Sequence, residues 1–287
     1  MTVIGVDVGG TNIDAGLVSR GKILREYAIP SEAHKGRHIF LENLLKAIKN
    51  LKTKDTVAIG LGFPGALDIK KGICLTSPNL PIKNFQIRDF IENKLLLPVF
   101  INNDANCFAL GEAVYGAGKD YKNVVGITFG TGIGSGIILN KKIYEGRSNA
   151  GEFGHMTIDY NGWPCKCGSL GCFEEYCGSR GVMRLARKIS VISPKEIYIQ
   201  AKKGNADAKK VWEDYGFYLG IGLANIAEAL DPDVIILGGK ISNAYTFFKD
   251  KMKETTEKYS FVGVPPIVKN KLGTKAAILG AAELCKV

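Results

Sequence analysis

The sequence predicts a two-lobed α/β protein with a cleft between its lobes. Strands and helices mix along all 287 residues, and both halves open with the same order of strand, glycine turn and strand. This repeated order indicates a weak internal duplication, and mixed elements in two similar halves are typical of an α/β fold. A chain of this length can bury a substantial core in each of two lobes.

The first half begins with a buried strand that ends in a glycine-rich turn. Apolar residues at positions 40, 44, 48 and 51 then have helical spacing. The first half is therefore expected to contain strands over 3–8, 11–18, 57–62 and 98–101 and helices over 39–51, 87–94 and 105–114.

The second half repeats the opening and then becomes mostly helical. Its expected elements are strands over 124–129, 135–139 and 234–237 and helices over 181–189, 194–202, 207–230, 244–259 and 276–285. We expect a smaller N-terminal lobe over residues 1–106 and a larger lobe over 107–273, with a C-terminal helix over 274–287 packing back on the smaller lobe.

Composition and charge exclude several classes of protein. The apolar content of 46% and charged content of 23% are those of a globular protein. The net charge is +10, but the lysines are scattered among acids, which favours a solvated surface over a nucleic-acid site. No apolar run approaches the roughly 20 residues that span a bilayer, and the first residues do not resemble a signal peptide. We expect a cytoplasmic protein without nucleic-acid or membrane partners.

Two glycine-rich loops, one in each half, are candidate phosphate-binding sites. The first, Asp7 to Asn12, includes Gly9, Gly10 and Thr11, and the second contains Gly130, Thr131, Gly132 and Gly134. Glycines let backbone N–H groups approach an anion closely. The second loop contains no lysine, so it is not a Walker motif. An ordinary glycine turn explains either loop alone, but together they favour a bound nucleotide.

Two further features complete the predicted nucleotide site. Asp7 is a candidate ligand for Mg²⁺, directly or through water, because this ion prefers oxygen ligands. Gly238 and Gly239 end a short buried strand and form a turn against which a nucleotide base could pack. A simple strand-to-helix turn explains these two glycines equally well.

Asp104 stands where a predicted strand gives way to a helix, between Asn103 and Asn106. A carboxylate there can accept the proton of a substrate hydroxyl that attacks phosphorus, and neighbouring amides can bind sugar hydroxyls. The alternative is a helix N-cap, since Asn and Asp are favoured caps. The two roles are compatible.

A zinc-binding loop is predicted over residues 155–172. His155 precedes Cys165, Cys167 and Cys172, and three thiolates with one imidazole form a closed tetrahedral Zn²⁺ set, as structural sites do. An ion there would hold Glu152 and Glu174 near one another, and two fixed carboxylates suit a polyol that donates hydroxyl hydrogens. The alternative for these two carboxylates is exposed surface charge.

These motifs together resemble the ROK family of sugar kinases and regulators, within the actin-like ATPase superfamily. The resemblance covers essentially the whole chain. Its most specific part is Cys-x-Cys-Gly-x-x-Gly-Cys-x-Glu, which matches Cys165 to Glu174 at every fixed position, and Glu-x-Gly-His at Glu152 to His155 precedes it. The resemblance implies two ribonuclease-H-like lobes that close on their substrates, and family members are commonly dimers or tetramers.

The resemblance also implies an activity and a set of roles. The chain would be an ATP-dependent hexokinase that phosphorylates the 6-hydroxyl of a hexose, with glucose favoured, and would need Mg²⁺ with ATP. Asp104 would be the general base. The implied sugar contacts are Gly65, Asn79, Asn103, Glu152, His155 and Glu174.

Three alternatives remain open from the sequence. N-acetylglucosamine and N-acetylmannosamine kinases share all of these motifs. A sugar-sensing repressor of the same family is a remote alternative, because such members carry a winged helix-turn-helix before the first phosphate motif, which begins here at residue 7. An actin-like ATPase without sugar chemistry would have no need of the zinc loop.

Overall fold

The computed structural model describes residues 1–286 and divides the chain into two compact units. The first unit contains residues 1–122, 136–151 and the residues from 271 onward, and the second contains 123–135 and 152–270. Among the described residues, no helix combines the length and apolar character needed to cross a bilayer.

The first unit is built on a five-stranded mixed sheet in the order β3-β2-β1-β4-β8. Strands β1, β2 and β3 are antiparallel neighbours, whereas β4 and β8 extend the sheet in parallel. The five strands are β1 (Thr2–Val8), β2 (Asn12–Ser19), β3 (Lys22–Pro30), β4 (Thr56–Phe63) and β8 (Val99–Asn103).

Helices cover both faces of this sheet, because successive residues of a strand point to opposite sides. Ile4 and Val6 of β1 share a buried cluster with Leu44 of helix α1 (Arg37–Leu51). Gly5, between them, faces helix α9 (Lys275–Glu283), where a Cβ atom would meet the Ile278 carbonyl oxygen. The sheet therefore lies between α1 and α9.

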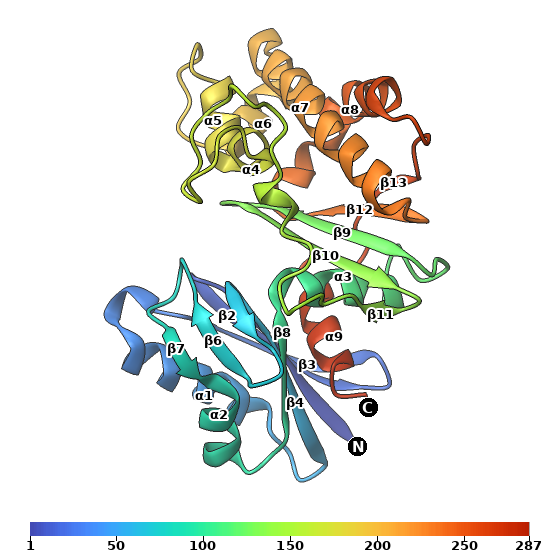
Figure 1. Ribbon diagram of the computed structural model, residues 1–287. Helices are drawn as coiled ribbons and strands as arrows, with labels where there is room; N and C mark the ends of the chain where they lie inside the picture. The colour runs from blue at the N-terminus through green and yellow to red at the C-terminus, as the bar shows by residue number, and fades with distance from the viewer. Residues whose placement is uncertain (287) are drawn as a thin grey trace. The chain divides into compact units, whose positions relative to one another are not determined.

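The C-terminal helix α9 also packs tightly against helix α3 (Asp104–Tyr115), beside which it lies in Figure 1. A Cβ atom on Gly280 would lie 1.7 Å from the carbonyl oxygen of Cys107, and one on Gly60 would lie 1.7 Å from that of Ala281. Only glycine permits backbones to approach this closely. The contact with α9 groups all of α3 with the first unit, so the predicted lobe boundary after residue 106 falls inside a helix.

The remaining elements of the first unit include a small antiparallel sheet that the hydrophobic pattern did not predict. Its order is β5-β6-β7, and its strands are β5 (Ala66–Asp68), β6 (Ile73–Thr76) and β7 (Lys83–Gln86). Strand β3 was also missed. These strands are short or largely exposed, so their sequences lack the apolar runs of buried strands. Helix α2 (Ile87–Leu95) follows β7.

A second five-stranded sheet has the order β11-β10-β9-β12-β13. Strands β9 (Val124–Phe129), β12 (Val234–Gly238) and β13 (Ile267–Lys269) are parallel neighbours in the second unit. Strand β10 (Ile133–Leu139) begins two residues before its predicted start and pairs with the short β11 (Lys142–Ile143). The division between the two units passes within β10.

The helices of the second unit pack on this sheet through an aromatic core. The long helix α7 (Ala206–Leu230) lies beside α8 (Tyr245–Tyr259) in Figure 1 and brings Trp212 and Tyr215 into one buried cluster with Phe129. The shorter helices are α4 (Phe173–Cys177), α5 (Ser179–Leu185) and α6 (Pro194–Lys202). The helix predicted over 181–189 is α5, which ends at Leu185.

Candidate active site

The first glycine loop is a rigid turn between β1 and β2. The Gly9 N–H donates to the Asn12 carbonyl at 2.8 Å. Ser31 holds the loop from the side: its N–H donates to the Thr11 carbonyl at 2.8 Å and its hydroxyl donates to the Gly10 carbonyl at 2.6 Å. These contacts fix the backbone before any ligand arrives, which an anion site of backbone N–H groups requires.

Asp7, at the end of β1, is a buried carboxyl group beside this loop. It pairs in register with Asp14 on β2. Burial raises the pKa of Asp7 from its ordinary value of 3.8 to about 8, and the negative charges of Asp104 and Asp14 act in the same direction. A divalent cation would relieve this repulsion, so the environment of Asp7 fits the predicted Mg²⁺ site.

Asp104 occupies the first position of α3, and its neighbour Asn103 is the N-cap. The Asn103 side-chain oxygen accepts the N–H groups of Ala105 at 2.9 Å and Asn106 at 3.4 Å. Asp104 accepts the Ala105 N–H at 2.9 Å. Asn103 is therefore the residue that caps α3. The negative charge of Asp104 raises the pKa of Asp7, the predicted magnesium ligand.

Two further predicted sugar contacts lie near these groups in the first unit. The Asn103 side-chain amide donates to the Gly65 carbonyl at 3.4 Å. Gly65 has a φ of +104°, and a Cβ atom there would lie 2.3 Å from the Thr76 carbonyl oxygen. Asn79 is exposed and lies against Gly10, whose Cβ atom would be 3.0 Å from the Asn79 Cβ. In the first unit, Asn103 thus lies beside Gly65, and Asn79 lies beside the first glycine loop.

The second glycine loop, between β9 and β10, is held by Ser179, which the sequence did not single out, and by Glu174, which it predicted as a sugar contact. The Gly130 carbonyl accepts both the N–H and the hydroxyl of Ser179, at 2.9 and 2.6 Å. The Ile133 N–H donates to a carboxylate oxygen of Glu174 at 2.9 Å. Within the loop, the Gly130 N–H donates to the Gly132 carbonyl at 2.9 Å.

A cavity of about 630 Å³ opens beside this loop within the second unit. Gly130 and Thr131 form one wall, and aromatic and apolar side chains form another. The predicted glycines Gly238 and Gly239 do not line this cavity. Gly239 packs against the backbone of Phe129, and the next residue in the chain, Lys240, is a lining residue. The other lining residues are Ser179, Ser193, Pro194, Lys195, Tyr198, Ile199, Trp212, Lys240, Ile241, Asn243 and Ala244. A flat base and its phosphates suit this combination of an apolar slot, lysines and a glycine loop.

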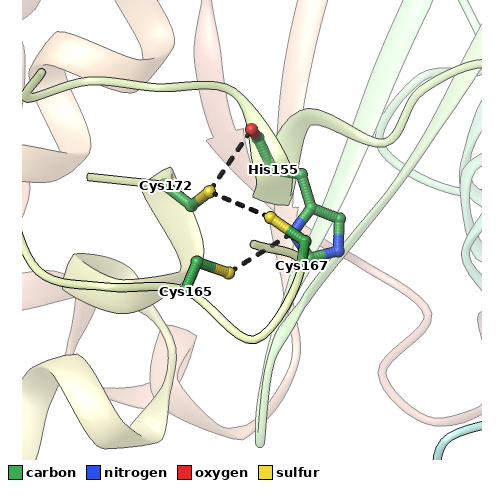
Figure 2. Close-up of side chains that lie close together, drawn as sticks. All are labelled: His155, Cys165, Cys167 and Cys172. Carbon is green, nitrogen blue, oxygen red and sulfur yellow. Dashed lines mark hydrogen bonds between the residues drawn. The ribbon is translucent and has the colours of Figure 1, made fainter. Parts of the chain in front are cut away.

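The predicted metal ligands lie together, as Figure 2 shows. One ligand atom from each of His155, Cys165, Cys167 and Cys172 lies within 4.8 Å of every other. The sulfur atoms of Cys167 and Cys172 are 3.6 Å apart, and the Cys165 sulfur is 3.7 Å from His155 Nδ1. A tetrahedron with zinc–ligand bonds of about 2.0–2.3 Å has edges of roughly 3.5–3.8 Å. The four residues therefore fit a structural Zn²⁺ ion.

Two carboxylates adjoin this cluster. Glu152 accepts the His155 N–H through its backbone carbonyl at 3.0 Å. Burial raises the pKa of the Glu152 carboxyl, the charge of Glu174 acts in the same direction, and His155 opposes both. The Glu174 side chain is 21% exposed. The Glu174 carboxylate is thus partly enclosed, which contradicts the alternative of exposed surface charge for this residue, whereas Glu152 is an exposed residue.

Sequence reasoning named Glu174, Gly130 and Thr131 but missed the other residues that support the second loop or line its cavity. Ser179, Lys195, Trp212 and Lys240 are separated along the chain, so no spacing pattern connects them. Ser179 is the exception: it lies seven residues after Cys172, the last cysteine of the zinc motif, and this proximity in sequence could have marked it as a candidate site residue.

Comparison with known proteins agrees with this geometry. The family model described as "ROK family" matches residues 3–287. A glucokinase of Halalkalibacterium halodurans is 35% identical, with 99% of this chain and 94% of that protein covered. The xylose repressor of Bacillus subtilis is 35% identical over 79% of this chain and 60% of its own length.

A solved structure gives the same result for the fold. The ROK family glucokinase of Streptomyces griseus, in complex with glucose and AMPPNP, has a TM-score of 0.88 and 31% identity, and 100% of this chain and 99% of that one are covered. Since the family model spans almost every residue and the full-length relatives exceed 30% identity, this chain belongs to the ROK family.

Proposed function

We propose that this chain is an ATP-dependent glucokinase that transfers the γ-phosphate of ATP to the 6-hydroxyl of glucose. The observation that carries the proposal is the likeness over the full chain to glucokinases, one of which holds glucose and an ATP analogue in its structure. The α/β fold, the two glycine loops and the carboxylate at the end of β8 all suit this reaction.

The nucleotide is proposed to bind in the cavity beside Gly130 and Thr131. Its base enters the apolar slot at Trp212 and Tyr198, and backbone N–H groups of the glycine loops bind the phosphates. Mg²⁺ binds with ATP and supplies charge stabilisation for the phosphoryl oxygens. Asp7 holds it directly or through water, and the raised pKa of its carboxyl falls when the cation binds.

Asp104 is proposed as the general base. Phosphoryl transfer leaves little covalent work to the protein, so positioning of the attacking hydroxyl and removal of its proton are the main tasks. Asp104 lies on a capped helix start at the end of a buried strand, a rigid support for such a group.

The proposed sugar contacts are those of the sequence motifs. Gly65, Asn79, Asn103, Glu152, His155 and Glu174 are proposed to bind sugar hydroxyls. Structural Zn²⁺ at His155 and the three cysteines fixes the loop that carries the last three of these residues. Since His155 is also a zinc ligand, its ring orientation is set by the metal.

Location and assembly follow from the same proposal. A thiolate site needs reduced cysteines, which suits the cytoplasm, where ATP is also supplied. We propose that the chain forms a homo-oligomer, either a dimer or a tetramer, because members of the family commonly do so. Light scattering coupled to size exclusion measures its mass directly.

The decisive experiment is a coupled ADP-release assay with glucose, N-acetylglucosamine, N-acetylmannosamine and a sugar-free control. Glucose should give the highest kcat/KM, by at least about tenfold. A higher kcat/KM for N-acetylglucosamine or N-acetylmannosamine would show that the chain is instead a kinase for that sugar. ADP release that does not depend on any sugar would leave only the actin-like ATPase function.

A sugar-sensing repressor is the second candidate, because the xylose repressor of Bacillus subtilis is as similar in identity as the glucokinase. The similarity covers 60% of that repressor but 94% of the glucokinase. Tight, sequence-specific retention of DNA by the purified chain, released by a sugar, would support this second function.

A further inference from the structure

The segment that follows the zinc motif holds the second glycine loop at two points. Helix α4 begins directly after the metal ligand Cys172, which is its N-cap residue, and α5 continues from it after Gly178. Two side chains of this segment, Glu174 and Ser179, bond to the loop of residues 130–133, which we call the phosphate loop.

The first contact fixes one oxygen of the Glu174 carboxylate. Its Oε2 atom accepts the Ile133 N–H at 2.9 Å. The carboxylate also lies against Gly132, since a Cβ atom on that residue would lie 2.1 Å from Oε2. The other oxygen, Oε1, is 3.9 Å from the Arg180 guanidinium. One oxygen is therefore committed to the phosphate loop, and the carboxylate cannot turn without breaking a charge-assisted hydrogen bond.

The second contact holds the opposite end of the phosphate loop. The Gly130 carbonyl accepts both the N–H and the hydroxyl of Ser179. Gly178 lies beside this contact, and a Cβ atom there would be 3.2 Å from the Thr131 carbonyl oxygen. The loop is thus bonded at residues 130 and 133 to one short segment, and Ser179 lines the cavity proposed for the nucleotide.

A buried ion-pair group keeps this segment rigid. The Glu175 side chain is fully buried and bonds to Arg180 and to Arg184, the latter at 2.8 Å. Phe173 donates its N–H to the Met156 carbonyl at 2.8 Å and packs edge-to-face on Phe129, the residue before the phosphate loop. Movement of Glu174 therefore moves the loop with it.

We propose that Glu174 positions the phosphate loop as well as binding sugar, so that one carboxylate couples the glucose and nucleotide sites. This inference rests on the proposed kinase function. Glu174 uses Oε2 to hold the backbone at Ile133, which fixes the other N–H groups of the phosphate loop for the phosphates, and leaves Oε1 to accept a sugar hydroxyl. Preorganising the loop in this way lowers the entropic cost of nucleotide binding, and Ser179 does the same at Gly130.

Glu152 provides a matched comparison. It adjoins the same metal cluster and has the same proposed sugar role, but within residues 1–286 no hydrogen bond joins its side chain to the phosphate loop. The proposed coupling therefore predicts that loss of the Glu174 carboxylate weakens nucleotide binding and loss of the Glu152 carboxylate does not. If both residues only bound sugar, neither loss would change nucleotide binding.

The test measures the Kd of MgADP without sugar, and of glucose without nucleotide, by titration calorimetry of the full chain. The variants are Glu174→Ala, Glu174→Gln, Glu152→Ala and Ser179→Ala. Gln removes the negative charge but keeps an oxygen that accepts the Ile133 N–H, so the comparison of Gln with Ala separates charge from positioning. Zinc content and circular dichroism establish that each variant is folded.

We expect Glu174→Ala to bind MgADP about tenfold more weakly than Glu174→Gln does, as loss of one loop hydrogen bond implies. Ser179→Ala should weaken MgADP binding about threefold and leave glucose binding unchanged, because the Ser179 N–H still holds Gly130. Glu152→Ala should weaken glucose binding alone. The matched control Ser260→Ala, which removes a hydroxyl bond to the Gly263 carbonyl of 2.7 Å, should change neither.

Equal MgADP affinity in Glu174→Ala and Glu174→Gln would overturn the proposed coupling. If Glu174→Ala does not fold, the Ser179→Ala variant provides the test, and an MgADP affinity equal to that of the parent protein would overturn the coupling. Failure of the parent protein to bind MgADP would instead overturn the proposed kinase function. The two failures are thus distinguishable in one set of titrations.

Discussion

At the scale of single residues, the chemistry depends on carboxylates whose surroundings differ although their residue type is the same. Asp7 is enclosed among other acids, and its pKa is raised. Asp104 stands one position after an asparagine cap. Glu174 is bonded to a loop amide, whereas Glu152 is mainly affected by burial. Each environment suits the separate role proposed for it.

Asp104→Asn should lower kcat by about 10²–10⁴, the usual contribution of a general base. Glucose and MgADP affinity should stay within about threefold, because the amide keeps the shape of the side chain and the cap on α3 belongs to Asn103. Steady-state kinetics and calorimetry measure the two effects. Near-normal turnover would contradict the assignment of Asp104.

Asp7→Asn should alter how stability depends on pH in the absence of Mg²⁺. The folded carboxyl keeps its proton up to about pH 8, whereas the unfolded chain loses it near 3.8. The folded state therefore binds more protons across this window, and the free energy of unfolding falls as pH rises, by at most about 1.4 kcal/mol per pH unit. The Asp7→Asn variant should lack the part of this fall in unfolding free energy that the Asp7 carboxyl causes.

Urea unfolding at pH 5, 6.5 and 8 measures the effect. The difference in unfolding free energy between Asp7→Asn and the parent should shift in favour of the variant as pH rises. Parallel curves for the two proteins would show that the Asp7 carboxyl titrates normally.

At the scale of elements, the metal loop is an irregular segment that short contacts close on itself. Thr157 pairs with Cys172 and Pro164 pairs with Leu170 in isolated bridges. Trp163 stacks on Tyr176 with ring centres 4.5 Å apart. Few residues of this loop are fully buried, so a metal ion held by the four ligand residues would add to the stability of the loop.

Cys167→Ser should reduce zinc from about one ion per chain to a small fraction and lower the melting temperature by several degrees. Cys167 is exposed, so the loss of a thiol at this position removes a ligand without opening a core cavity. Metal analysis and thermal unfolding provide the measurements. Its neighbour Lys166→Ala is the control and should retain the ion; metal-free parent protein with the same melting curve would reject the site.

Helix α9 is positioned by glycines rather than by large side chains. Gly280→Ala should lower the free energy of unfolding by about 1–3 kcal/mol or more, because its Cβ atom would lie 1.7 Å from the Cys107 carbonyl and force α3 and α9 apart. Lys275→Ala, on the same helix, removes an exposed ion pair with Glu26 and should cost less than about 1 kcal/mol. Urea unfolding compares them, and equal stability of both variants would contradict the packing argument.

At the scale of the whole molecule, the chain passes between the two units after residues 122, 135, 151 and 270. Within the first unit, the buried carboxylate of Glu112 holds the last of these junctions, accepting the N–H groups of Lys271 and Leu272 at 3.1 and 2.8 Å. It also accepts the Ala117 N–H at 2.8 Å. Lys141 donates to three carbonyls near the first junction. The first unit thus holds the chain through hydrogen bonds near the junction after residue 122 and at the junction after residue 270.

Glucose should stabilise the protein, because a ligand that binds the folded chain and not the unfolded one raises the free energy of unfolding. At a concentration of 100 times its Kd, bound ligand adds about 2.7 kcal/mol to the free energy of unfolding. For a chain of this size that corresponds to a rise in melting temperature of roughly 5 °C or more. Sorbitol, which lacks the ring, is the control, and an equal rise with sorbitol would indicate a general polyol effect.

The sequence determined most of the regular elements and the local motifs. Buried strands such as β1 and β4 carry apolar runs, and the cysteines of the zinc motif all lie within eight consecutive residues, so both signals are local. It did not reveal β3 or the small sheet β5-β6-β7, whose exposed strands lack such runs. It also placed a lobe boundary inside α3, since the packing of α9 on that helix joins residues far apart in the chain.

Only the tertiary structure decided which side chains support the motifs. The bond from Glu174 to Ile133 crosses 41 positions, and that from Ser179 to Gly130 crosses 49. The raised pKa of Asp7 depends on Asp104, almost a hundred residues away on another strand end. Sequence patterns report local periodicity and spacing, whereas hydrogen bonds and electrostatic interactions depend on distance in space, which the folded chain alone sets.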